Sequence, residues 1–232
     1  MKNFADNQMK AVIFDLGGTL IKTSEIPHVM KKILEDCGIN RSLDKISKVW
    51  LKVHKETNYQ DLKTLLDEFW VQWNQRILFN LDIKSEKRKL AKFIASHWWS
   101  YSEVTLFPDA MTVLPLLKKK NVKLGVITNG LESDIKAILP KVNLQKFFDV
   151  VVLIDTLRKM KPDIEVFNYA LEELGVENFE AIFVGDEVPT DYEGALNAGL
   201  TVYLIDRQKR IKDSKIKTIT SLEDIIKFHF CK

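Results

Sequence analysis

Asp15 stands where a short apolar run gives way to a glycine-rich turn. It follows Val12-Ile13-Phe14 and precedes Leu16, Gly17 and Gly18. Apolar runs of this length are typical of buried parallel strands, and open α/β sheets place their chemistry outside the carboxyl ends of such strands. The two glycines let the backbone turn sharply, so that its N–H groups approach whatever the carboxylate attacks or binds. The stretch predicts either a site built on Asp15 or an ordinary strand and turn.

Three later stretches carry side chains that would complete such a site. In chain order, the candidates after Asp15 are Thr128, Asn129, Lys161, Asp186, Glu187 and Asp191. Thr128 and Asp186 each follow an apolar run, and Lys161 precedes a helix start in the triplet Lys-Pro-Asp. The carboxyl ends of parallel strands meet at one edge of a sheet, so these groups would converge there if the strands pair.

The elements that must position these residues are strands and helices in alternation. Beyond Phe107 the pattern switches repeatedly between short apolar runs and helical spacing. Strands separated by helices of about ten residues predict right-handed crossovers and a parallel sheet covered on both faces. The expected strands are 122–128, 150–154, 181–186 and 201–205, and the expected helices are 109–120, 132–139, 163–174, 190–198 and 221–226. The predicted fold class is α/β, with a Rossmann-like three-layer core around a central parallel sheet.

A different pattern fills the region from residue 26 to residue 102. Apolar residues recur there at helical spacing, and four helices are expected. The breaks between them fall at 37–40, 58–59 and 80–82. All five tryptophans lie between Trp50 and Trp99; they fill the core of a helical bundle or its seam with the α/β part, or one or two of them line a pocket facing Asp15. A bundle that buries its own apolar stripes can fold as a separate lid.

Composition narrows the class of partner and the compartment. The chain has 232 residues, 46% of them hydrophobic, and a formal net charge of +3. So weak a basic excess argues against nucleic-acid binding, and the basic run 207–217 is expected to be a solvated loop. Cys37 and Cys231 are far apart, which argues against a disulfide framework and favours the cytoplasm. No apolar run approaches the length of a membrane span or a signal-peptide core, so no membrane association is expected. The sequence does not indicate an oligomeric state.

The candidates in this order, an Asp, a Thr, a Lys and an acidic pair, resemble the four motifs of the haloacid dehalogenase-like (HAD) hydrolase superfamily. The resemblance covers residues 10 to about 206 and is specific as a set. It implies that residues 22–104 are a helical cap, inserted after the nucleophile strand, that selects the substrate. Residues 1–21 and 105–232 would form the Rossmann-like core. It also implies a hydrolase, here a Mg²⁺-dependent phosphatase that acts on a small phosphorylated metabolite through an aspartyl-phosphate.

The resemblance assigns a role to each candidate. Asp15 would be the nucleophile, and Mg²⁺ would be held by Asp15, Asp186 and the backbone carbonyl of Gly17, which suits the preference of this ion for oxygen ligands. Lys161 would neutralise the transferred group, and Thr128 would hydrogen-bond a phosphoryl oxygen. Further phosphate contacts would come from Leu16, Gly17 and Asn129, and the supporting positions would be Thr19, which props the turn, and Glu187 and Asp191, which hold metal waters or orient the lysine.

Gly17 departs from the family pattern. The phosphatases of the superfamily carry a second Asp at this position, which protonates the leaving alcohol and later activates water. Four hypotheses remain: a phosphohydrolase whose leaving group needs no proton or takes one from the cap or a water; a 2-haloacid dehalogenase; a phosphonatase-type hydrolase; and a phosphate-binding or Mg²⁺-binding protein with weak or no turnover. Dehalogenases need no metal and typically lose part of the acidic motif, whereas Asp186 and Asp191 are both present. The sequence therefore favours a Mg²⁺-dependent phosphohydrolase in which Gly17 replaces the general acid.

Overall fold

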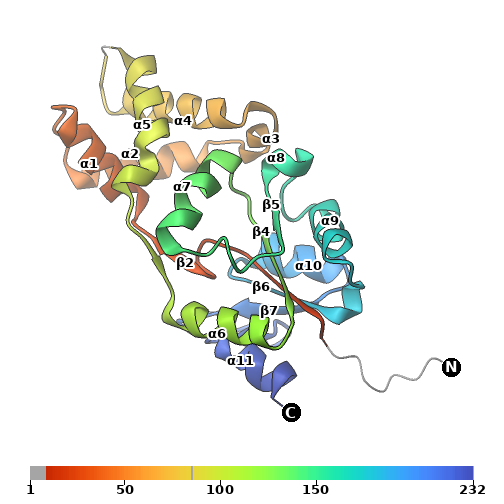
Figure 1. The fold of residues 1–232 in the computed structure, drawn as a ribbon. Coiled ribbons are helices and arrows are strands. Elements are labelled where there is room, and N and C mark those ends of the chain that lie inside the picture. Colours follow the sequence, from red (N-terminus) through yellow and green to blue (C-terminus); the bar gives the residue numbers. More distant parts are fainter. Residues whose placement is uncertain (1–8, 85, 232) are drawn as a thin grey trace. The chain divides into compact units, whose positions relative to one another are not determined.

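The computed structural model describes residues 9–84 and 86–231. Its central sheet has six strands in the order β5-β4-β1-β6-β7-β8, and all neighbouring strands are parallel (Figure 1). These strands are β1 (Ala11–Phe14), β4 (Lys123–Ile127), β5 (Val150–Val152), β6 (Ala181–Gly185), β7 (Thr201–Ile205) and β8 (Thr218–Ile219). A separate two-stranded sheet pairs β2 (Ile21–Thr23) with β3 (Val104–Leu106). The α/β fold class predicted from the sequence is confirmed.

The register of the central strands sets where the candidate residues emerge. All four residues of β1 are buried, and Val12 pairs with Leu124 of β4 on one side and with Ile182 of β6 on the other. Because the three strands run in the same direction, the segments that follow them leave the sheet at the same edge. Asp15 follows β1 directly at this edge, as Asp186 follows β6.

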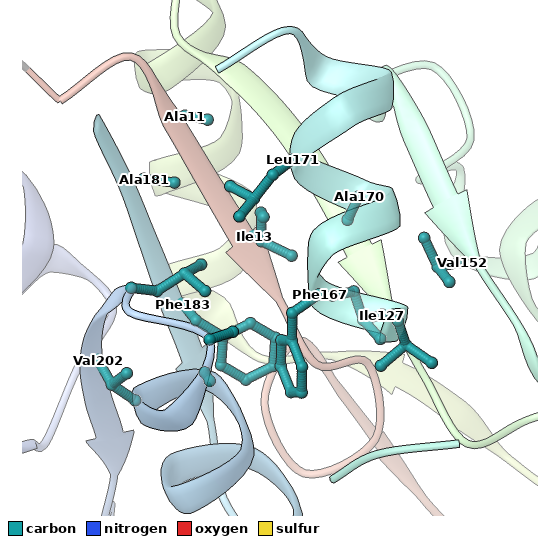
Figure 2. Close-up of a cluster of buried hydrophobic side chains, with 14 of the residues drawn as sticks. Ala11, Ile13, Ile127, Val152, Phe167, Ala170, Leu171, Ala181, Phe183 and Val202 are labelled. Carbon is teal, nitrogen blue, oxygen red and sulfur yellow. The ribbon is translucent and has the colours of Figure 1, made fainter. Parts of the chain in front are cut away.

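Helices flank the sheet. One face packs against α9 and α10, where Ile13 and Phe183 of the strands meet Phe167 and Ala170 of α9 in a buried cluster (Figure 2). The rings of Phe167 and Phe183 meet edge to face with centroids 5.2 Å apart. Helix α6 packs against β4 and against α11, and right-handed crossovers place it on the opposite face from α9. The helices that follow β3 along the chain are α6 (Pro108–Lys119), α7 (Glu132–Val142), α8 (Ile154–Leu157), α9 (Ile164–Leu174), η2 (Asn178–Glu180), η3 (Val188–Tyr192), α10 (Glu193–Asn197), α11 (Glu223–Ile225) and η4 (Ile226–Phe230).

The region before β3 is helical and has a core of its own. Its elements are α1 (Ile26–Asp36), α2 (Leu43–Lys55), η1 (Tyr59–Asp61), α3 (Leu62–Leu65), α4 (Asp67–Asn80) and α5 (Lys87–Tyr101). The four long helices stand where four were expected, and η1 and α3 are short additions between the second and third. Trp73 is buried in the core, and Trp50, Trp70 and Trp98 pack against it. Most of the tryptophans therefore serve the internal packing of this region.

The chain divides into two compact units. Among the described residues, the α/β unit contains 9–22, 105–130 and 139–231, and the helical unit contains 23–84, 86–104 and 131–138. The sequence analysis assigned residues 131–138 to the Rossmann-like core, and the structure groups them with the helices. Two hydrogen bonds account for this, because Ser133 Oγ donates to Asp67 Oδ1 at 2.6 Å and Trp99 Nε1 donates to Asp134 Oδ1 at 2.7 Å.

A few short elements differ from expectation. Strand β5 ends at Val152 and is followed by the turn of helix α8, where a strand to residue 154 was expected. Strands β2, β3 and β8 are only two or three residues long and were not expected. Both cysteines are exposed and unpaired. Among the described residues, no helix has both the length and the apolar character needed to cross a membrane.

Candidate active site

The loop that carries Asp15, residues 15–21, is closed by its own backbone. Asp15 N–H continues the sheet by donating to the Val184 carbonyl at 2.8 Å. The N–H groups of Leu20 and Ile21 both donate to the Leu16 carbonyl, at 2.9 and 3.0 Å, and Gly18 N–H donates to the Ile21 carbonyl at 2.8 Å. We call these seven residues the Asp15 loop. The bonds hold it in one conformation at the edge of the sheet.

Lys161 joins two buried carboxylates. Its Nζ donates to Asp15 Oδ1 and to Asp191 Oδ1, each at 2.6 Å, and the three residues are 3%, 8% and 2% exposed, respectively. Charge-assisted hydrogen bonds of this length are strong, and burial strengthens them further. Lys159, the neighbouring lysine, bonds instead to the side chain of Glu165. Of the two lysines, only Lys161 belongs to the site.

Asn129 holds the backbone of Lys161 from both sides. Its Oδ1 accepts from Lys161 N–H at 2.7 Å, and its Nδ2 donates to the Lys161 carbonyl at 3.1 Å. The resemblance implies that Asn129 contacts the substrate phosphate, and that contact stays a prediction. In the structure both ends of the amide are used to fix the segment that carries the lysine, and this contact depends on loop conformation that residue spacing does not reveal.

Asp191 folds back onto the end of β6. Its Oδ2 accepts from the N–H groups of Asp186 and Glu187, both at 3.1 Å, while its Oδ1 accepts from Lys161. Gly185 makes this possible, because a Cβ at that position would lie 2.4 Å from the Asp191 carboxyl carbon. Both oxygens of Asp191 therefore accept hydrogen bonds, one from Lys161 and the other from the turn after β6.

Asp186 presents its carboxylate to the Asp15 loop. A Cβ added at Gly18 would lie 2.2 Å from Asp186 Oδ2, and Gly18 also has a positive φ of 79°. A glycine at this position is therefore required both by the backbone conformation and by the close approach of the carboxylate. Asp186 is exposed as a residue, but one side of its carboxylate is shielded by the loop.

The charges at this edge do not balance. Asp15, Asp186 and Asp191 each offer a carboxylate oxygen, and these three atoms lie within 4.8 Å of one another. The ammonium of Lys161 is the cation that bonds two of them. Three carboxylates and one ammonium leave two negative charges. An all-oxygen donor set with this excess suits one hard divalent cation such as Mg²⁺.

The same imbalance shifts the protonation of the acids. Burial raises the pKa of Asp15 to about 6 against the attraction of the Lys161 ammonium, and the Asp191 carboxylate adds to the rise. Desolvation, followed by repulsion from Asp15 and Asp191, raises the pKa of Asp186 to about 7. The pKa of Lys161 is also raised, because the two carboxylates outweigh the effect of burial. Without a cation, these acids hold protons that ordinary Asp side chains release.

The remaining candidates lie at the periphery of this cluster. Thr128 is half-buried at the end of β4, and its N–H donates to the Val152 carbonyl at 3.1 Å. Glu187 is exposed and its Oε2 accepts from Thr190 Oγ1 at 3.2 Å. Thr19 is fully buried, and its hydroxyl has no hydrogen-bond partner among the described residues. The expected prop through the Thr19 side chain is therefore absent there; its carbonyl accepts from Arg207 instead.

Gly17 is exposed in the middle of the Asp15 loop. A Cβ added there would have no atom within 4 Å, and its φ lies outside the left-handed region. The structure therefore offers room for a side chain at the position where the resemblance expects an acid.

Comparison with known proteins assigns the chain to a family. Residues 12–205 match the profile of haloacid dehalogenase-like hydrolases. The chain belongs to this family. The matched span includes every strand-end residue described above.

Relatives within the family include phosphatases and a dehalogenase. The glyceraldehyde 3-phosphate phosphatase of Methanothermobacter thermautotrophicus is 29% identical over 206 residues, covering 86% of this chain and 87% of the relative. The (S)-2-haloacid dehalogenase 4A of Burkholderia cepacia is 26% identical over 211 residues, covering 87% and 85%. Among solved structures, a HAD phosphatase from Thermococcus onnurineus is 26% identical with a TM-score of 0.66, covering 94% of this chain and 97% of that one. These comparisons support a hydrolase with phosphatases among its relatives.

Proposed function

We propose that this protein is a Mg²⁺-dependent phosphohydrolase that transfers a phosphoryl group from a small phosphorylated metabolite to Asp15 and then to water. The observation that carries the proposal is the group of three carboxylates around Lys161, with its excess of two negative charges. A dehalogenase site has no use for that excess, because halide is displaced without a metal ion. The archaeal relative named for glyceraldehyde 3-phosphate supports a small phosphorylated substrate.

Mg²⁺ would be held by Asp15, Asp186 and the carbonyl oxygen of Gly17. We assign Asp191 a supporting place beside the ion, because its oxygens accept hydrogen bonds from Lys161 and from two backbone N–H groups. The ion would supply charge neutralisation, which allows a carboxylate to approach a phosphate dianion.

The residues of the chain would carry the two chemical steps. Asp15 Oδ1 is bonded to Lys161, so Oδ2 would attack phosphorus as the ester P–O bond breaks. Lys161 would offset the negative charge on the transferred group, and Thr128 with the backbone N–H groups of Leu16 and Gly17 would bond its oxygens. In the second step, water attacks the phosphorus of the aspartyl-phosphate, which releases inorganic phosphate and restores the carboxylate.

Gly17 determines which leaving groups this site handles well. An alkoxide must take up a proton as it departs, and a carboxylic acid in that place typically contributes ~10² to 10⁴-fold to the rate. Gly17 contributes no such group. We therefore assign to this protein substrates with good leaving groups, such as acyl phosphates, or a proton supplied by water or by another part of the chain.

We also propose that the helical unit is a substrate-selecting cap. Two observations support this: it is inserted directly after the strand of the proposed nucleophile, and it buries a core of its own. Its residues would carry the substrate specificity, and the cytoplasm would be the compartment in which a small metabolite reaches it.

The test is covalent labelling. Incubation with acetyl [³²P]phosphate and Mg²⁺ should label the wild-type protein, and Asp15→Asn or chelation of the metal should abolish the label. Lys161→Met should reduce the labelling. With Mg²⁺ present to offset the negative charge of the carboxylates, this variant should still fold. Unlabelled wild type that turns over a 2-haloacid without metal would establish the dehalogenase instead. Turnover of a phosphonate but not a phosphate ester would establish the phosphonatase. Ligand binding that survives Asp15→Asn, with no label and no turnover, would leave a binding protein.

A further inference from the structure

Arg207 begins the basic run 207–217, which was expected to be a solvated loop, but its side chain is held by neighbouring groups. Its side chain is 23% exposed, and its guanidinium lies 3.9 Å from the ring centroid of Phe107. Nη1 and Nη2 donate to the two oxygens of Asp109, at 2.6 and 3.1 Å. Such a bidentate pair, stacked on an aromatic ring, fixes the guanidinium in one place.

Asp109 is in turn held by the C-terminal part of the chain. Its Oδ2 also accepts from Leu222 N–H at 2.8 Å and from Ser221 Oγ at 3.2 Å. Burial alone would raise the pKa of Asp109, but these donors and Arg207 outweigh it and lower the pKa. The carboxylate is therefore a charged anchor for Arg207.

The second group that Arg207 contacts belongs to the Asp15 loop. Nη2 donates to the Thr19 carbonyl at 3.0 Å. The other end of the same peptide unit, Leu20 N–H, donates to the Leu16 carbonyl at 2.9 Å. The next carbonyl, that of Leu20, accepts from Phe107 N–H at 3.0 Å. Arg207 and Phe107 thus hold two successive carbonyls of the loop, those of Thr19 and Leu20.

The hydrogen bond from Arg207 to the Thr19 carbonyl affects the proposed phosphate-binding N–H group of Gly17 through the planarity of the peptide units. A planar trans peptide points its C=O and N–H in opposite directions. Fixing the Thr19–Leu20 peptide directs Leu20 N–H onto the Leu16 carbonyl. Holding the Leu16 carbonyl inside the turn points Gly17 N–H out of it. The orientation of the Gly17 N–H group therefore depends in part on the Thr19–Leu20 peptide, which Arg207 fixes, while Ile21 N–H supplies the second bond to the Leu16 carbonyl.

We infer that Arg207, anchored by Asp109, is a positioning residue that sets the backbone orientation of the Asp15 loop for catalysis. The inference rests on the proposed function, because it concerns how well the loop presents its groups to a transferred phosphoryl group. Arg207 contacts neither the acids nor Lys161 directly. It acts through Thr19, which directly follows the exposed Gly17 and Gly18 of the loop.

The experiment compares Arg207→Met and Arg207→Lys with two control variants. Ser221→Ala removes one donor to Asp109 but leaves the Arg207–Thr19 bond. Asp149→Asn breaks an ion pair elsewhere in the α/β unit, between Lys118 Nζ and Asp149 Oδ1 at 2.8 Å. For each protein, kcat and KM for acetyl phosphate, the yield of Asp15 labelling and the melting temperature are measured with saturating Mg²⁺.

Arg207→Met should lower kcat by about 10- to 100-fold with KM changed by about twofold or less, since small misplacements of catalytic groups have effects of this size. Arg207→Lys, which can keep one donor to Thr19, should retain more activity. Both controls should keep a kcat near wild type even where the melting temperature falls as far. This separation between kcat and stability distinguishes positioning from a purely structural role.

Two results would overturn the inference, and they are distinguishable. If wild type turns over acetyl phosphate but folded Arg207→Met keeps its kcat, or Asp149→Asn loses as much, Arg207 has no positioning role. If wild type is neither labelled nor active towards phosphates, the proposed function fails and the inference fails with it.

Discussion

Gly17→Asp tests whether the missing acid limits this site. The structure accommodates the change, because an added Cβ meets no atom within 4 Å and the backbone is outside the left-handed region. The introduced carboxyl would stand two residues after Asp15, in the exposed turn of the Asp15 loop. Burial, with repulsion from neighbouring carboxylates added, raises the pKa of Asp15 and Asp186, and the same repulsion would raise the pKa of the introduced carboxyl. A raised pKa keeps the introduced group protonated at the start of turnover, which is the state that a general acid needs.

The magnitude follows from what proton transfer contributes. A well-placed general acid gives ~10² to 10⁴-fold, or about 3 to 5 kcal/mol of barrier. The surroundings of Gly17 were not selected for an acid, so we expect a gain at the lower end of this range for alkyl phosphates. Acetyl phosphate should gain little, because its leaving group departs without a proton.

The assay is a series of phosphate esters whose leaving alcohols differ in pKa. In wild type, log(kcat/KM) should fall steeply as the leaving-group pKa rises, and in Gly17→Asp the slope should be shallower. Gly17→Asn is the matched control, since it has the same size and no proton to give. The reasoning is refuted if Gly17→Asn gains as much as Gly17→Asp, or if wild type already shows the shallow slope.

Two further predictions concern the groups around the loop. In the metal-free protein the raised pKa values of Asp15 and Asp186, about 6 and about 7, mean that the folded state binds more protons than the unfolded state from about pH 4 to pH 7, so stability from these groups falls as pH rises through this window. Mg²⁺ competes with those protons, and the gain in melting temperature on its addition should be small at pH 5 and larger at pH 8; a gain independent of pH would contradict this. Asn129→Leu should lower kcat with little change in KM, because it removes the hydrogen bonds that hold the backbone of Lys161. A raised KM with unchanged kcat would instead indicate that the Asn129 amide contacts the substrate.

The sequence identified the edge of the sheet at which the site lies. Asp15 and Asp186 each follow an apolar run, and parallel pairing of β1 with β6 brings such positions to one edge whatever the loops do. Lys161 could be found only through the family motif, because no periodicity places it beside the two acids. The alternation of strands and helices could be predicted from the sequence, because the long elements show either short apolar runs or apolar residues at helical spacing.

What the sequence missed depends on loop conformation and on single hydrogen bonds. The Asn129 amide could equally face a phosphate or a backbone, and only the path of the chain at Lys161 decides between them. Arg207 lies in a run of basic residues whose composition is that of a solvated loop, and one buried partner, Asp109, removes it from solvent. Strands of two or three residues, such as β8, are too short to show a period.

The central position of β1 also has a consequence for folding during synthesis. Val12 leaves the ribosome early, but one of its neighbours is Leu124 and the other is Ile182. At translation speeds of about 5 to 20 residues per second, the second neighbour emerges roughly 10 to 30 s after the first strand. Until β4 has been made, the four apolar residues of β1 have no strand of the central sheet to pair with, while residues 23–104 can already pack into their own core. The strand that leads into Asp15 is thus the first strand of the central sheet to be made, and it gains its second neighbour only after β6 has been made.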